Sequence, residues 1–143
     1  MEKTKHFFWF QLPAIAWAAA IFIQSSLSDI SAPELGFDWQ DKVYHAIEYA
    51  ILGFLLIRAL RFQRNHFLQK HAAWLTFLIG SAYAISDEIH QFYVPGRMAD
   101  VHDVIADIVG VALVLIIYLL LIRIRRGCRR DFTDEPVTLD QSG

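Results

Sequence analysis

Three ionisable residues near the middle of this 143-residue chain recur at helical spacing. Asp41, His45 and Glu48 are separated by four and three positions, so a helix would carry them on one face. An imidazole beside carboxylates could act as a general acid or base, and a His-x-x-Glu pair could also hold a divalent metal. The pattern therefore predicts a site for proton transfer, metal binding or ligand binding on this helix face.

A second polar group follows about forty residues later, where one apolar run ends and the next begins. Its carboxylates again have spacings of three and four, which predicts a second stripe on a helix. A single arginine lies between the two runs, after a Pro-Gly turn. The members of this group are Asp87, Glu88, Gln91, Arg97, Asp100, Asp103 and Asp107.

Several of these residues also have purely structural interpretations. Asp100 could be the N-cap of a helix with Asp103 in its first turn, and Asp41 could likewise cap its own helix. Asp87 and Glu88, with Gln91 after them, could form a wet helix end at the membrane surface. Arg97 could simply neutralise a neighbouring aspartate. These alternatives stay open from the sequence alone.

Glu48 and Asp107 are harder to explain in this way, because each lies more than one turn inside an apolar run. A carboxylate at the centre of a membrane helix costs roughly 2.5–3.5 kcal/mol on insertion scales. The fixed cations nearby are only Lys42 and Arg97. They cannot neutralise all the carboxylates, so some must be protonated, hydrated, or bound to a metal or a cationic ligand. The six carboxylates are Asp41, Glu48, Asp87, Glu88, Asp103 and Asp107.

Four apolar runs must position these groups. Each has about the 17–25 residues that a helix needs to cross a bilayer, and none alternates as a barrel strand would. The chain is 55% hydrophobic, with a mean hydropathy of +0.34. We therefore predict an all-α membrane protein with a four-helix transmembrane bundle, whose first run is a retained helix rather than a cleaved leader. The runs are Phe7–Ile23, Val43–Leu60, Ala72–Ile89 and Val104–Ile122.

Basic residues set the expected orientation. Eleven of the 13 precede the first run, lie at the end of the second run or between it and the third, or follow the fourth. The positive-inside rule makes that side cytoplasmic, so both termini are predicted inside and the Gln24–Gln40 loop outside. Residues 1–122 would form one membrane domain, and residues 123–143 a basic and then disordered cytoplasmic tail. A single cysteine, Cys128, excludes a disulfide framework and a CxxC metal site.

The combined pattern resembles the VanZ-like family of bacterial membrane proteins over roughly residues 7–122. One departure is Asp107, where we expect the family to carry asparagine. His90 and His102 lie outside the family pattern. The matching stretches are Asp41-Lys42-x-x-His45-x-x-Glu48-Tyr49 with Leu52-Gly53, Asp87-Glu88-x-x-Gln91, and Pro95-Gly96-Arg97-x-x-Asp100-x-x-Asp103-x-x-x-Asp107-x-x-Gly110, with Ser25-Ser26 as a weaker match.

The resemblance implies a multi-pass protein of the bacterial inner membrane, in a family whose named member lowers sensitivity to teicoplanin. We rank first a non-enzymatic cell-envelope factor that binds an amphiphile, either a lipid-linked glycan precursor or a lipoglycopeptide. Arg97 and Lys42 would then grip a phosphate or carboxylate. The expected partners are this ligand and the lipid bilayer, with no nucleic acid.

An intramembrane enzyme acting on a lipid-linked substrate ranks second. In this hypothesis His45 is the acid or base, Glu48 or Asp103 orients it, and a divalent metal is an open alternative. No G-x-S-x-G or comparable nucleophile signature favours covalent catalysis. A proton-coupled transporter ranks third, since four short spans without an internal repeat make a poor transporter alone.

Overall fold

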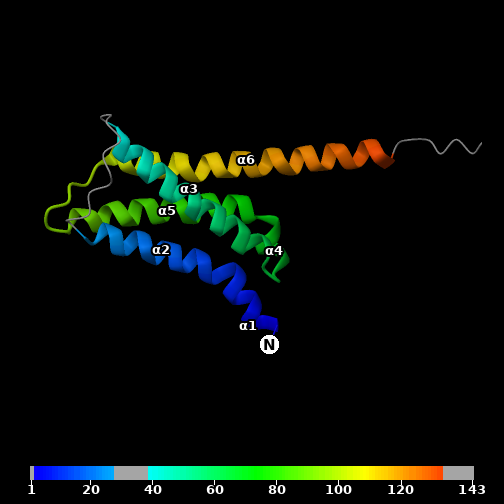
Figure 1. Ribbon diagram of the computed structural model, residues 1–143, viewed down its shortest axis with the longest axis horizontal. Coiled ribbons are helices and arrows are strands. Elements are labelled where there is room, and N and C mark those ends of the chain that lie inside the picture. Colours follow the sequence, from blue (N-terminus) through cyan, green and yellow to red (C-terminus); the bar gives the residue numbers. More distant parts are fainter. Residues whose placement is uncertain (1, 28–38, 134–143) are drawn as a thin grey trace, which may run out of the picture.

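The computed structural model describes residues 2–27 and 39–133, and within these ranges every regular element is helical. Four long helical segments lie side by side and alternate in direction along the chain (Figure 1). The elements are α1 (Glu2–His6), the π-helical turn η1 (Phe7–Gln11), α2 (Leu12–Ser25), α3 (Gln40–Arg61), α4 (His66–Lys70), α5 (Ala72–Phe92) and α6 (Val101–Thr133).

Three helical segments in the described residues are long and apolar enough to cross a membrane: Thr4–Ser25, Gln40–Arg61 and Val101–Arg125. They confirm the first, second and fourth predicted spans in all but their exact ends. The third predicted span forms the 21-residue helix α5, which carries Asp87 and Glu88 in its last turns and is not among these three segments. That α5 also crosses the bilayer stays a prediction.

The first long segment changes its hydrogen-bond pattern at η1. The Leu12 N–H donates to Phe7 O, five residues back, and Pro13 follows directly. Since proline has no N–H, the carbonyl of Trp9 lacks its usual helical donor. Arg58 of α3 supplies one, with Nη2 2.5 Å from Trp9 O. The proline thus creates an acceptor that ties the start of the chain to α3.

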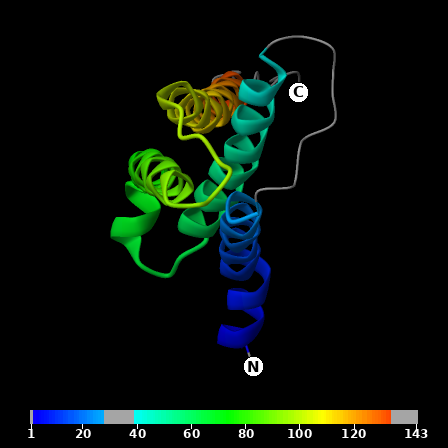
Figure 2. The same ribbon diagram turned by 90° about the vertical axis from the view of Figure 1, so that its left-hand side faces the viewer.

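Helix α3 is the centre of the bundle. It packs most extensively on α6 and also contacts α5 and α2, while α2 rests on α3 and α5 (Figure 2). Tyr49, Leu52 and Val111 are at most 1% exposed and form the core. Around them the outward faces carry many exposed apolar side chains, as lipid contact requires.

Glycines allow the closest helix approaches. A Cβ on Gly110 of α6 would lie 2.1 Å from Ala46 O of α3, so no larger residue fits without moving a backbone. Gly53 and Gly80 leave room for Val111, which sits between α3 and α5. Gly110 is therefore a close-packing site between α3 and α6.

Helix α6 is longer than predicted. Its backbone stays helical to Thr133, beyond the expected end at Ile122, because the arginine-rich stretch has good helix propensity. The predicted tail therefore begins as helix, and residues 134–143 lie outside the described residues. Most of the predicted outer loop, residues 28–38, also lies outside them.

Candidate functional site

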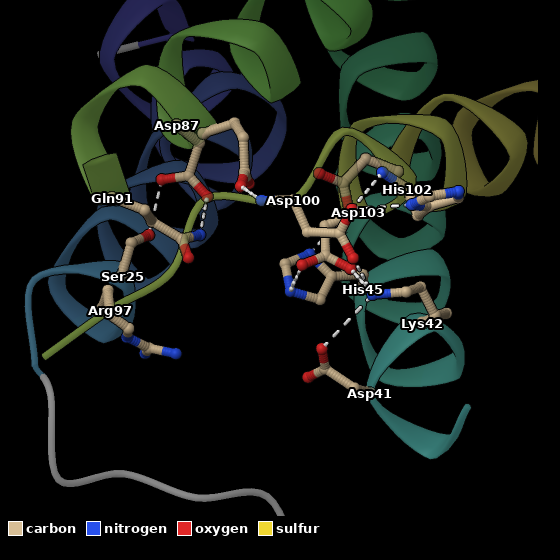
Figure 3. Close-up of polar contacts among 12 residues, drawn as sticks. Ser25, Asp41, Lys42, His45, Asp87, Gln91, Arg97, Asp100, His102 and Asp103 are labelled. Atoms are coloured by element: carbon tan, nitrogen blue, oxygen red, sulfur yellow. Dashed lines mark hydrogen bonds and ion pairs between the residues drawn. The ribbon is translucent and has the colours of Figure 1, made fainter. Parts of the chain in front are cut away.

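All the candidate residues meet at one end of the bundle, where α2 and α5 end and α3 and α6 begin (Figures 1 and 3). We call this set the polar cluster. Four of its carboxylates, those of Asp87, Glu88, Asp103 and Asp107, are at most 8% exposed. Its members are Ser25, Asp41, Lys42, His45, Glu48, Asp87, Glu88, Gln91, Arg97, Asp100, Asp103 and Asp107.

Lys42 joins the start of α3 to the start of α6. Its Nζ lies 2.5 Å from Asp103 Oδ1, 2.9 Å from Asp100 Oδ2 and 3.8 Å from Asp41 Oδ2. This ammonium donates to the Asp100 carboxylate and holds the pKa of Asp100 well below its usual range. Lys42 is thus engaged by protein carboxylates, which makes it a weaker candidate for gripping a ligand anion than the sequence predicted.

His45 lies between two buried carboxylates of α6. Its Nδ1 is 3.1 Å from Asp107 Oδ1, and its Nε2 is 3.9 Å from Asp103 Oδ2. A carboxylate that accepts a hydrogen bond from the Nδ1–H group fixes the tautomer of the imidazole. Nε2 is then the ring nitrogen that can take up or release a proton. An asparagine in place of Asp107 could accept the same hydrogen bond through its amide oxygen. This departure from the expected family residue therefore fits the geometry.

Asp87, Glu88 and Gln91 point inward rather than to water, so the wet-helix-end interpretation is wrong. Asp87 Oδ1 lies 2.5 Å from Ser25 Oγ, and its Oδ2 accepts from Gln91 Nε2 at 3.3 Å (Figure 3). Glu88 Oε1 accepts from the backbone N–H of Asp100, whereas Oε2 is buried with no partner among the described residues. Together they link α5 to α2 and α6.

The capping predictions had different outcomes. Asp100 Oδ1 accepts from the backbone N–H of His102 at 2.9 Å, as an N-cap of α6 should, and Asp103 lies in the first turn. Asp41 is not the cap of α3, because the residue at that position is Trp39. Asp41 lies in the first turn instead, with its side chain 63% exposed.

Arg97 reaches back across the end of α2. Gly96, with φ of 85°, adopts a left-handed conformation that favours glycine and turns the chain there. Arg97 Nη2 donates to Gln24 O at 2.8 Å, while Nε is buried and has no partner among the described residues. The ion pairs of Asp100 and Asp103 in the described chain go to Lys42 and histidines. The structure therefore does not support the interpretation that Arg97 neutralises these aspartates.

A small cavity of about 50 Å³ opens between the two halves of the polar cluster. This volume suits a few water molecules, one ion or one small polar group, so a larger ligand would have to extend out of it. Its lining is mostly polar, and α2 contributes Gln24 as well as Ser25. The lining residues are Ile21, Gln24, Ser25, Asp41, Tyr44, His45, Glu48, Asp87, Gln91 and Arg97.

One corner of the cluster has the donors for a divalent cation. Asp41, His45 and Asp103 each offer a ligand atom, and these atoms lie within 4.8 Å of one another. Oxygen and imidazole donors suit a divalent ion. Lys42, however, already places its positive charge on Asp103, so a metal would have to displace that ammonium.

Sequence reasoning missed Gln24 and gave little weight to Ser25. Gln24 offers its carbonyl to Arg97 and lines the cavity together with Glu48. Both residues are uncharged and lie at the end of an apolar run. The only signal was the Ser25-Ser26 pair at the end of that run.

A helical bundle with three helices long and apolar enough to cross a bilayer indicates a membrane protein. The chain belongs to the VanZ/LLP1 family, whose family model matches residues 3–123. The resemblance noted from the sequence is thus confirmed over most of the chain. Searches among curated proteins and among solved structures gave no match.

Proposed function

We propose that this VanZ-like protein is a cell-envelope factor of the bacterial inner membrane. It binds the head group of an amphiphile, a lipid-linked glycan precursor or a lipoglycopeptide, at the outward-facing polar cluster. By this binding it would lower sensitivity to glycopeptides such as teicoplanin.

The topology proposed with it has four spans, α5 included, and both termini in the cytoplasm. The start of α1, the end of α3, helix α4 and the end of α6 gather at the end of the bundle opposite the polar cluster (Figure 1). Ten of the 13 basic residues belong to these segments, and Arg64 lies in the short connection between α3 and α4. This clustering supports an inward-facing basic end and an outward-facing polar cluster.

The position of Arg97 carries the binding proposal. Its guanidinium lines the cavity and, among the described residues, donates only to the neutral carbonyl of Gln24, while Lys42 forms the ion pairs with Asp100 and Asp103. Arg97 is therefore the cation available for a phosphate or carboxylate of the ligand. Glu48 and Asp87 also line the cavity and would receive a cationic group of the same ligand.

The test is ligand retention by Arg97→Lys and Arg97→Ala, measured by native mass spectrometry in mild detergent with co-purified lipid or added teicoplanin. Lysine keeps the charge but loses the planar two-donor grip, so binding should weaken by about 1–3 kcal/mol. Arg64→Ala, which removes an exposed arginine outside the cavity, is the matched control. Wild-type binding by both Arg97 variants, at equal thermal stability, would show that Arg97 is only structural.

One observation favours an enzyme as the second candidate. The Asp107–His45 pair has the arrangement of an oriented general base, and His45 lines the cavity. Purified protein incubated with a bacterial lipid extract should then change the mass of one lipid class, and His45→Gln should abolish that change. An unaltered lipid profile with the wild-type protein would leave binding as the function.

A further inference from the structure

A large groove lies far from the polar cluster, between the second halves of α3 and α6. The two helices are close where both begin and splay apart toward α4 (Figure 1). The opening between them has a volume of about 640 Å³. Nothing in the binding proposal uses this part of the molecule.

The walls of the groove are apolar and accessible. Phe54 on α3 and Phe62 directly after its end are 56% and 54% exposed, and Ile117 and Leu121 on α6 are 56% and 52% exposed. Ile57 closes the floor between them. Since this surface lies within or next to the candidate spans, hydrocarbon chains rather than water would meet it.

Three arginines line the same groove at the basic end of the bundle: Arg58, Arg61 and Arg125. Arg58 donates to Trp9 O, and Arg61 donates to Gln69 O, both neutral carbonyls. Among the described residues, every ion pair is formed by Lys42 or a histidine. The groove therefore joins an apolar trough to cationic charge that forms no ion pair with a carboxylate of the described residues.

We propose that this groove binds an anionic phospholipid of the surrounding bilayer. An acyl chain lies between α3 and α6 against Phe54 and Ile117, and the phosphate contacts Arg61 and Arg125, with Arg58 beside them. Basic pockets between membrane helices on the cytoplasmic side are suited to anionic head groups. The arginines thus do more than set topology: part of the basic end forms one side of a lipid site.

Charge complementarity favours a lipid over a second copy of the chain. Copies inserted in one membrane share the same orientation, so a neighbour would bring its own basic end to this level. Its arginines would then face Arg61 and Arg125, and like charges repel. A phospholipid instead supplies the anion and the hydrocarbon in one molecule.

The test is native mass spectrometry of the full chain, titrated with phosphatidylglycerol or with phosphatidylcholine of the same acyl composition. Arg61→Gln/Arg125→Gln removes two charges from the groove. Arg64→Gln/Arg123→Gln removes two exposed charges of the same end that do not line it. At about 1 kcal/mol per arginine, or roughly fivefold each, the groove variant should bind phosphatidylglycerol more than tenfold less tightly.

A second variant, Ile117→Trp, fills the trough without changing charge and should also reduce phosphatidylglycerol binding. If the arginine variant fails to fold, phosphatidylglycerol binding by Ile117→Trp still tests the proposal. Equal binding of the two lipids by the wild-type protein would overturn the proposal, as would equal losses in the groove and control variants. A dimer mass that disappears on Ile117→Trp would assign the groove to a second copy instead.

Discussion

The α3–α6 pair has two very different ends. Where the helices begin, Gly110 lets their backbones touch, and the cations there are bound to aspartates, with Lys42 at 2.5 Å from Asp103. Where they diverge, exposed apolar side chains line a groove, and Arg61 donates only to a backbone carbonyl. Both ends carry cations, yet among the described residues only those of the first end form ion pairs with carboxylates.

Burial explains this difference. Asp103 and Asp107 are at most 5% exposed, so leaving either charge alone would cost several kcal/mol. Arg125 is exposed, and water or lipid phosphate can compensate its charge. Tight packing and ion pairing therefore belong together at one end, while the other end stays open for exchangeable partners.

The largest expected effect comes from removing one cation at each end. Lys42→Met leaves the buried Asp103 without its ammonium and beside Asp100, so we expect a loss of about 3 kcal/mol in the free energy of unfolding. Arg125→Met, measured in an uncharged detergent, should change it by less than about 0.5 kcal/mol. Chemical unfolding of both variants checks this. Similar losses for the two would mean that the ends do not differ in this way.

A packing comparison should give a somewhat smaller effect. Gly110→Ala places a Cβ against Ala46 O and forces α3 and α6 apart, at a cost of about 2–3 kcal/mol. Ile117→Val in the open groove should cost under about 0.5 kcal/mol, since nothing packs tightly there. Thermal melting in one detergent measures both. A harmless Gly110→Ala would show that the close contact is not required.

The smallest effect concerns pH at the first end. Lys42 lowers the pKa of Asp100 in the folded state, so this carboxylate stabilises the fold above its unfolded pKa of about 3.9. The contribution is lost as the pH falls toward the lower folded pKa. Asp100→Asn keeps the N-cap but not the charge, and its melting temperature should lie below that of the wild type at pH 7.

The two melting temperatures should then converge as the pH is lowered below about 4. A gap that stays constant with pH would assign the effect of Asp100 to the N-cap hydrogen bond alone.

The sequence predicted the first end better than the second. Helical spacing placed His45, Glu48 and Asp107 on inward faces, because a carboxylate inside an apolar run has few other places to point. It did not indicate that Lys42, rather than Arg97, would form the ion pairs with the aspartates at the start of α6. These pairs depend on how α3 and α6 pack.

The groove was not predictable, because residues such as Phe54 and Ile117 look like any lipid-facing positions. They line a groove only because α3 and α6 diverge there. The link from Pro13 to Arg58 through the carbonyl of Trp9 also needed the three-dimensional arrangement. Local pattern predicted the elements and the polar end, and tertiary geometry determined the rest.

The pairing of α3 with α6 also has a consequence for how the protein is made. The partners of Lys42 and His45 lie 58 to 62 residues later in the chain. At about 5–20 residues per second, roughly 3–12 s pass between the synthesis of the two sides. Until α6 has been synthesised, Lys42 and His45 of α3 lack these partners. In a chain truncated before α6, Lys42 and His45 would never gain these partners. Stable folding of the bundle therefore requires that α6 be translated.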